Sequence, residues 1–256
     1  MTSRLRARRR VLLVVTALAF IAVLAHLGLL DAGQLAFGAR NVAIFTRDLF
    51  PPDPTVIGRV GIAILETIEI AFAGTLLGCV AALPLAIASS EVAAGPGSAR
   101  VMRAVLAFIR TIPALLWAVV FVVAVGLGAA AGTLGVAVYS AGYLGKLYAD
   151  AMDGVDPEVI EAVRATGASR VQVARLAIIP ETMHALLTQL LFVFEYNVRA
   201  SSILGFVGAG GIGFYLLGYL QSLQYDRLMT AVLATFVAVM LIDALSARLY
   251  RWLTDA

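Results

Sequence analysis

Charged and polar side chains cluster in one apolar stretch near residue 200. Glu195 and Arg199 are four residues apart, so on a helix they share one face, which Ser202 continues. Asn197 and Ser201 project from roughly the opposite side. A guanidinium can bind a tetrahedral oxyanion through its planar fork, and neutral side chains can add hydrogen bonds. The cluster predicts either an oxyanion contact at Arg199 or a Glu195–Arg199 pair that holds helices together.

These five side chains cannot all reach one ligand from a regular helix. Either the helix breaks near Ser201, or some of the five bind neighbouring helices instead. Both alternatives are compatible with the sequence.

The composition indicates that this polar cluster is surrounded by apolar, membrane-embedded helices. Of 256 residues, 61% are hydrophobic and only 14% are charged, and the mean hydropathy is +0.95. A soluble domain carries about a quarter charged residues. The chain is therefore predicted to be an integral membrane protein. Charged groups in mid-bilayer cost about 2.5–3.5 kcal/mol even on lenient insertion scales, so those that persist tend to mark pathways.

The same counts exclude several classes of protein. With two histidines and one cysteine, the chain has no metal-ligand spacing and no nucleophile–base pair, so neither a metal site nor an enzyme is expected. Lys146 is the single lysine, and no phosphate-cradling G-x-x-x-x-G-K-[ST] loop surrounds it. No cofactor is expected in this chain. If ATP drives the protein, another chain hydrolyses it.

Apolar runs predict an all-α fold with about six membrane spans, at roughly 11–30, 62–88, 104–128, 133–150, 183–205 and 228–247. Six spans place both termini in the cytoplasm, with twelve basic residues inside and four outside, in agreement with the positive-inside rule. Residues 1–59 are expected to form a cytoplasmic tail, the first span and a polar external connector. Residues 60–250 form the predicted core, which includes a polar cytoplasmic loop at 151–180.

Residues 208–213 read GAGGIG and match G-x-G-x-x-G letter for letter. A dinucleotide site would need a strand before this motif, and an apolar helix precedes it instead, so that function is disfavoured. Two interpretations remain, a flexible turn or a close-packed gate, because glycines let backbones approach. At least one of Gly210 and Gly211 is expected to need a positive φ or a contact too close for a Cβ. The candidate gate residues are Gly208, Gly210, Gly211 and Gly213.

The polar stretch 151–180 predicts a helix–turn–helix. Helix-forming residues occupy 157–166 and 168–178, and Gly167 between them is expected to take a left-handed conformation at a helix C-terminus. Small alanines leave one surface suited to close docking. The alternative is a plain charged loop on the inner side.

This stretch resembles the E-A-A signature of ABC importer permeases, members of the binding-protein-dependent permease superfamily. The matching residues are Glu161, Ala162, Gly167 and Pro180. Val163 and Ala177 depart from the pattern. In that family the loop forms short cytoplasmic helices that dock on an ATPase subunit, so the resemblance implies an ATPase-coupling role for the four matching residues.

Three further segments look like the permease of phosphonate-type ABC importers: 110–118 (RTIPALLWA), 141–148 (AGYLGKLY) and 194–205 (FEYNVRASSILG). The resemblance runs from about residue 60 to 250 and implies the type I (MetI-like) permease fold. The candidate substrate path comprises Arg199, Glu195, Asn197, Ser201, Ser202, Arg110, Lys146 and Tyr143.

Two members of this path have alternative interpretations. Arg110 precedes Pro113 and either snorkels to the inner membrane surface or lines the inner half of a cavity. Lys146 has Asp150 one helical turn later, which favours a solvated pair at the membrane interface. Glu66 and Glu69 are expected to be gate or packing partners, because carboxylates repel an anionic substrate.

The resemblance implies a permease subunit that translocates phosphonate, phosphite or phosphate across the bacterial cytoplasmic membrane. Its implied partners are a second permease, identical or homologous, two ATPase subunits that bind ATP and Mg²⁺, and an external substrate-binding protein. Membrane lipid surrounds it, and no nucleic acid is expected. The alternatives are a permease of the same architecture for another small substrate, such as methionine, and an ion-coupled secondary transporter. The latter usually shows an internal repeat, which this sequence lacks.

Overall fold

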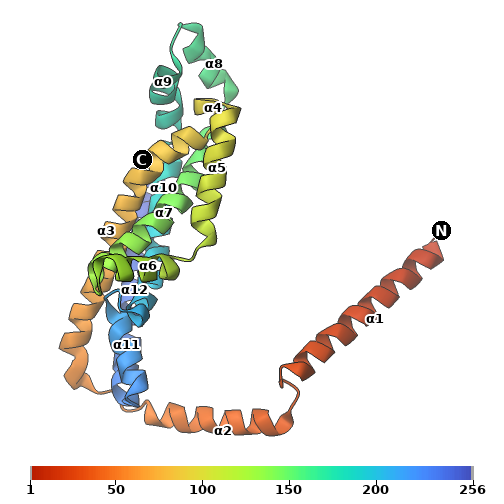
Figure 1. The fold of residues 1–256 in the computed structure, drawn as a ribbon, viewed down its shortest axis with the longest axis vertical. Helices are drawn as coiled ribbons and strands as arrows, with labels where there is room; N and C mark the ends of the chain where they lie inside the picture. The colour runs from red at the N-terminus through yellow and green to blue at the C-terminus, as the bar shows by residue number, and fades with distance from the viewer. Residues whose placement is uncertain (1, 255–256) are drawn as a thin grey trace. The chain divides into compact units, whose positions relative to one another are not determined.

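The computed structural model describes residues 2–254, with side chains for 8–169 and 171–252. The described residues form helices and turns without a strand (Figure 1), so the all-α prediction is confirmed and a dinucleotide-binding βαβ unit is excluded there. The chain divides into two compact units, residues 1–51 and 52–256.

The first unit contains helices α1 (Thr2–His26) and α2 (Ala32–Asp48). The apolar part of α1, Arg8–His26, is long enough to cross a membrane. The second helix lies within the segment 31–59 that was predicted to be a polar external connector. The Asp31 side chain accepts hydrogen bonds from the backbone N–H groups of Gly33 (2.8 Å) and Gln34 (3.1 Å) and thereby caps α2.

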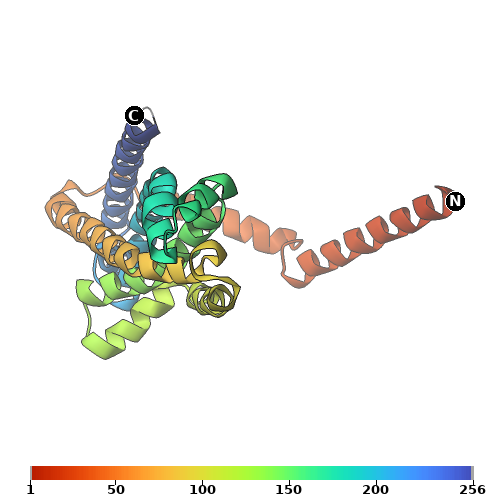
Figure 2. The same cartoon turned by 90° about the horizontal axis from the view of Figure 1, so that it is seen from above.

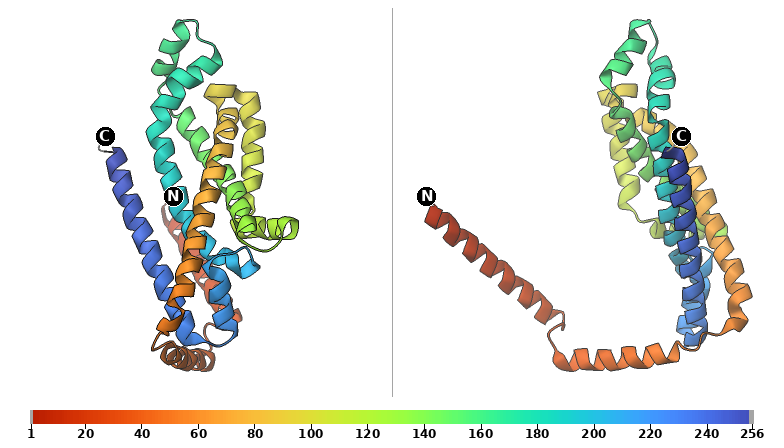
Figure 3. Two further views of the ribbon diagram at one scale, coloured as in Figure 1. Left: turned by 90° about the vertical axis from the view of Figure 1, so that its left-hand side faces the viewer. Right: turned by 180° about the vertical axis from the view of Figure 1, so that it is seen from behind.

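Four long helices make up most of the second unit: α3 (Ile57–Ser89), α7 (Ala129–Asp153), α10 (Ile179–Leu204) and α12 (Tyr225–Thr254). Helices α3 and α7 approach closely because glycines face the contact. A Cβ on Gly74 would lie 2.6 Å from Val136 Cγ1, and one on Gly78 would lie 2.5 Å from Ser140 Cβ. Helices α12 and α6 lie on opposite sides of α3 (Figures 2 and 3).

A short 3₁₀ helix, η1 (Pro54–Val56), precedes α3. Asp53, the residue that caps η1, connects this region to the start of α12. Asp53 accepts a hydrogen bond from Arg227 Nε at 3.1 Å, and its carbonyl accepts one from Thr230 Oγ1 at 2.8 Å. Hydrogen bonding from Thr55, aided by Arg227, lowers the pKa of Asp53 below its ordinary value. The beginnings of α3 and α12 are thus fixed to each other.

The predicted third span is wrong as a single helix. Helices α5 (Pro96–Thr111) and α6 (Ala114–Val125) meet at an angle of 83°. Pro113 lacks an N–H group, and the residue before it, Ile112, takes an extended conformation (φ −96°, ψ 117°), as a residue preceding proline prefers. Helix α7 then begins at Ala129, four residues earlier than the predicted start of the fourth span.

Four helices among the described residues are long and apolar enough to cross a membrane, and the bent α5–α6 pair would make five. The remaining predicted span lies in α7, whose 25 residues include many small and polar ones as well as Lys146 and Asp150. The number of six spans and the cytoplasmic location of both termini therefore stay predictions.

The segment 151–180 contains α8 (Pro157–Ala165), α9 (Arg170–Val173) and a π turn, η2 (Ala174–Ile178). No break separates α9 from α10, which corrects the expected gap between 178 and 183. Pro180 cannot donate to the carbonyl of Leu176, and the π turn widens the backbone where a regular α-helix would clash with the proline ring. Helices α8 and α9 lie at one end of the second unit and α11 (Ile212–Gln221) at the other (Figure 1).

Candidate functional site

Asn197 lies in a fully buried polar contact between three helices. Its Nδ2 donates to Thr75 Oγ1 on α3 at 2.8 Å and to Ser140 Oγ on α7 at 2.7 Å. Ser201, one turn further along α10, is also fully buried. Because α10 continues to Leu204, the helix does not break at Ser201, and the alternative in which some side chains bind neighbouring helices is confirmed.

Arg199 lies on the opposite face of α10 and forms two ion pairs. Its Nη1 donates to both carboxylate oxygens of Asp243 on α12, at 2.7 and 2.9 Å. Its Nη2 lies 3.8 Å from Glu195 Oε2. Sequence reasoning found the Glu195 pair and missed Asp243. The sequence contained one sign of this partner, because Asp243 is the single charged residue in the predicted span 228–247.

This cluster is partly exposed within apolar helices. The side chains of Arg199 and Asp243 are 47% and 44% exposed, and both helices are apolar enough to cross a membrane. Charged groups do not face lipid hydrocarbon at this level of exposure, because the cost is several kcal/mol for each. The face of α10 and α12 that carries them must therefore meet water or another protein.

A hollow of about 390 Å³ adjoins Arg199, and we call it the α6–α10 hollow. It is lined by Pro113, Ala114, Leu115, Tyr196, Arg199, Ala200, Ile203 and Leu204. Helix α6 begins here without a side-chain cap, so the positive end of its dipole lies beside the guanidinium. The helix end and the guanidinium favour an anion, whereas the two carboxylates paired with Arg199 oppose one.

Stacked tyrosines connect this hollow to a second one. Tyr139 stacks on Tyr196 of α10 (centroids 6.1 Å apart) and on Tyr143 (5.9 Å). Tyr143 and Glu195 line the second, α7–α12 hollow of about 720 Å³, which lies between α7, α10 and α12. The tyrosine stack therefore connects the hollow beside Arg199 with the hollow lined by Tyr143 and Glu195.

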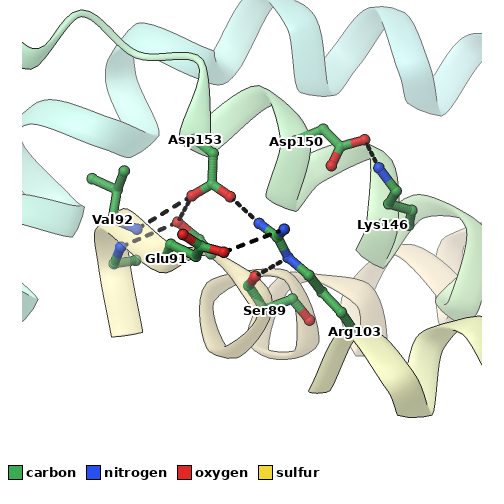
Figure 4. Close-up of polar contacts among 9 residues, drawn as sticks. Ser89, Glu91, Val92, Arg103, Lys146, Asp150 and Asp153 are labelled. Carbon is green, nitrogen blue, oxygen red and sulfur yellow. Dashed lines mark hydrogen bonds and ion pairs between the residues drawn. The ribbon is translucent and has the colours of Figure 1, made fainter. Parts of the chain in front are cut away.

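The two remaining basic candidates lie on or beside α7. Arg110 ends α5, and a Cβ on Gly142 would lie 3.3 Å from its Cγ, so its stem packs on α7 beside Tyr143. Lys146 binds Asp150 on the same helix, and both side chains are more than one-third exposed (Figure 4). The expected Lys146–Asp150 pair is confirmed, while a place for either basic residue on the substrate path stays a prediction.

The glycine segment 208–213 is tightly packed between α3 and the start of α7. Gly208, Gly210 and Gly211 all have positive φ values, of 78°, 83° and 79°. A Cβ on Gly210 would lie 2.9 Å from Ala129 N, and one on Gly211 would lie 2.6 Å from Thr67 Oγ1. The predicted conformation of Gly210 and Gly211 is confirmed, and the segment is not a loosely packed turn.

Gly213 approaches the end of α10 even more closely. A Cβ on Gly213 would lie 2.6 Å from Ser202 O, and one on Gly205 would lie 2.2 Å from Phe214 N. Backbone atoms cannot rotate aside as side chains can, so these positions admit only glycine. A gating role for the segment stays a prediction.

At the other end of the unit, Gly167 follows α8 with φ +81°. Its N–H donates to Arg164 O at 2.9 Å, and a Cβ there would meet nothing within 4 Å. The predicted left-handed turn at a helix C-terminus is confirmed. Glu161 and Ala162 are exposed on α8, and Pro180 lies in the first turn of α10.

A polar cluster that sequence reasoning missed lies beneath α8. The Asp153 carboxylate at the end of α7 accepts hydrogen bonds from Ser90 Oγ (2.6 Å), Val92 N (3.3 Å) and Arg103 Nη2 (Figure 4). Arg103 Nε also donates to Ser89 O at 3.0 Å. We call this the Asp153 cluster. It fixes the C-terminal ends of α3 and α7 to each other and to the middle of α5.

Residues 74–256 match the family described as the binding-protein-dependent transport system inner membrane component. The chain belongs to this family. The permease is 36% identical over 222 residues to the phosphite transport system permease protein PtxC of Stutzerimonas stutzeri, covering 86% of this chain and 81% of that one. It is 32% identical over 251 residues to the putative phosphite transport system permease protein HtxC of the same organism, covering 98% and 89%.

Two further comparisons involve proteins that are named for other substrates. The phosphate-import permease protein PhnE of Mycolicibacterium smegmatis is 36% identical over 219 residues, which cover 85% of this permease and 41% of that protein. A solved inward-facing MetNI methionine ABC transporter has a TM-score of 0.70 at 24% identity, covering 78% of this chain and 99% of that one. The latter likeness shows the fold alone.

These findings confirm the resemblance inferred from the E-A-A stretch and the three polar segments. They also confirm the type I permease fold. The family and its named relatives are membrane transport components, so the permease is not itself an enzyme.

Proposed function

We propose that the permease is the membrane-spanning subunit of an ATP-driven importer for phosphite, phosphonate or phosphate. The observation that carries the proposal is the 36% identity to a phosphite permease over four-fifths of that protein. The half-exposed Arg199 beside the α6–α10 hollow gives an anion a charged contact inside an apolar helix bundle.

In this proposal the transporter assembles from several chains in a bacterial cytoplasmic membrane. A second permease, identical or homologous, completes the membrane part, and an external binding protein delivers the oxyanion. Two ATPase subunits bind ATP and Mg²⁺ and dock on the surface formed by α8 and α9, through Glu161, Ala162 and the turn at Gly167. The exposed position of α8 supports this assignment, because a docking surface must be open before its partner binds.

Four of the candidate path residues, all on α10, divide into two groups. Arg199 and Ser202 face away from the α3–α7 contact and are proposed to meet the oxyanion. Asn197 and Ser201 are fully buried in helix packing and are proposed to position α10. The glycine segment 208–213 is proposed as the gate at the end of α10.

The proposal is tested by reconstituting the permease with its co-purifying subunits and measuring uptake of phosphite, methylphosphonate, phosphate and methionine. Arg199→Ala is expected to reduce oxyanion uptake by about 10–100-fold, since a hydrogen-bonded charge contributes about 1.5–3 kcal/mol. Arg199→Lys should also transport poorly, because lysine keeps the charge and loses the fork. Arg59→Ala, at an exposed position at the start of α3, is the matched control.

Uptake of methionine but of no oxyanion would overturn the proposed substrate class. Normal oxyanion uptake by Arg199→Ala would leave the substrate class intact and restrict Arg199 to holding helices together.

A further inference from the structure

Two carboxylates flank the Arg199 guanidinium. Asp243 places its oxygens 2.7 and 2.9 Å from Nη1, and Glu195 Oε2 lies 3.8 Å from Nη2. One positive and two negative groups give the cluster a formal charge of −1. An anion that approaches this arrangement is repelled, because like charges brought side by side are strongly unfavourable in a poorly screened site.

Arg199 therefore cannot hold an oxyanion while Asp243 keeps its present position. The two residues come from different helices and lie deep within them. Asp243 is 18 residues after the start of α12, or about 27 Å along the helix. Arg199 is 20 residues after the start of α10. If Asp243 left without a replacement, the arginine would keep only the longer contact of 3.8 Å with Glu195 and would lose both of its hydrogen-bonded oxygens, which is unfavourable among apolar helices. An oxyanion that replaces Asp243 restores these hydrogen bonds.

We propose that Asp243 occupies on Arg199 the place that the transported oxyanion takes, and that its return to Arg199 releases the oxyanion. This inference rests on the proposed function, and it makes Asp243 the residue that sets how tightly the permease holds its substrate. The exchange also links substrate to helix position, because the oxyanion can bind Arg199 only when the contact between α10 and α12 opens.

The geometry around the guanidinium suits such an exchange. Both Asp243 oxygens accept from Nη1, and Glu195 Oε2 lies 3.8 Å from Nη2, so a carboxylate stands at each end of the guanidinium. The direct hydrogen bonds all go to Asp243, so its departure frees Nη1 for an oxygen of a phosphate-like group. Arg199 lines the α6–α10 hollow, whereas Glu195 and Ser246, one turn beyond Asp243, line the α7–α12 hollow. An oxyanion in the first hollow and the carboxylates beside the second compete for one guanidinium.

The test is equilibrium binding of radiolabelled phosphite, phosphate and methylphosphonate to the purified transporter in lipid nanodiscs, without nucleotide and without the binding protein. Asp243→Asn keeps the size of the side chain and removes its charge. It is expected to bind an oxyanion at least about tenfold more tightly than the unmodified transporter, because a competing charge is gone. Asp243→Glu should bind as weakly as the unmodified protein. Asp226→Asn, on the same helix and outside this cluster, is the matched control.

A contact that only holds helices together predicts a different pattern, with lower thermal stability for Asp243→Asn and no gain in binding. Adding Arg199→Gln to Asp243→Asn should abolish the gain, which separates binding at Arg199 from binding on the ATPase subunits. Unchanged oxyanion binding by Asp243→Asn overturns the inference. If the unmodified transporter shows no uptake of any of the three oxyanions, the proposed function fails, whatever the variants bind.

Discussion

Gly167 and the glycines of segment 208–213 share a left-handed backbone and differ in their surroundings. At Gly210 and Gly211 an added Cβ would lie 2.6–2.9 Å from neighbouring atoms, whereas at Gly167 it would meet nothing within 4 Å. Segment 208–213 is packed tightly against other parts of the same chain. The turn at Gly167 has room for a side chain, which is compatible with the docking surface proposed above. The same residue type thus provides internal packing in one region and a free turn in the other.

The largest effect is expected from replacing both Gly210 and Gly211 with alanine. Each substitution introduces left-handed strain of about 1–2 kcal/mol, and the clashes with Ala129 and Thr67 add to it. Thermal unfolding in detergent should show a marked loss of stability, and uptake should fall more than assembly does. Gly218→Ala, on α11 with nothing within 4 Å, is the control. Unchanged uptake would make 208–213 an ordinary linker.

Asp153→Ala should have the next largest effect. It removes the acceptor of three hydrogen bonds that join the C-terminal ends of α3 and α7 and the middle of α5. We expect about 1–3 kcal/mol of destabilisation, near the lower figure because Arg103 is partly solvated. Hydrogen exchange should rise around 89–103 and remain unchanged around 208–213. Faster exchange in both regions would show that the two are not independently stabilised.

Gly167→Val tests the open region directly. The left-handed conformation costs valine about 1–2 kcal/mol in a turn with no neighbours to disturb, so the helix bundle should remain folded. Co-purification with the ATPase subunit and uptake should both fall, as they should for Glu161→Lys. Gly167→Asn is the matched control, because asparagine accepts left-handed backbone. Full ATPase binding by Gly167→Val would contradict the coupling assignment.

Substitution by asparagine also distinguishes the turn at Gly167 from the glycine segment 208–213. Gly210→Asn should fail where Gly167→Asn succeeds, because the contact with Ala129 N persists whatever the backbone preference of the new residue. Equal tolerance of asparagine at both positions in thermal unfolding would remove the distinction between them.

The smallest effect is expected from Lys146→Ala. Its pair with Asp150 is more than one-third exposed, and such pairs contribute about 0.5 kcal/mol or less. Thermal stability should hardly change. If uptake nevertheless falls strongly, Lys146 contacts the substrate on its path and is more than a surface pair.

Local sequence patterns predicted much of this architecture. The positive φ of Gly167 followed from its position between two helix-forming stretches. The adjacency of Gly210 and Gly211 predicted that at least one of them needs a positive φ or a contact too close for a Cβ, and both have a positive φ. The 83° bend between α5 and α6 could not be predicted from the sequence, although Pro113 lies at the bend. A proline predicts a perturbed helix, but the angle depends on what packs around it.

Local sequence patterns could not predict the ion pairs between different helices. Asp243 is 44 residues from Arg199, and Asp153 is 50 residues from Arg103, so neither contact follows from helical periodicity. An isolated charge in an apolar span signals that a partner exists. It does not say which helix provides the partner, because helix order along the chain leaves their adjacency undetermined.

The absence of a break between α9 and α10 has a mechanical consequence. Residues 171–207 form one apolar rod of 37 residues, about 55 Å long at 1.5 Å for each residue. A tilt of about 5° at one end of such a rod displaces the other end by about 5 Å. The π turn at 174–178 is the place where the rod can flex, since helices bend most readily at such turns. Nearly the whole length of the rod lies beyond this turn, and Arg199 lies close to its far end. If α8 and α9 form the coupling surface proposed above, the stiffness of residues 174–178 determines how far their displacement moves the guanidinium.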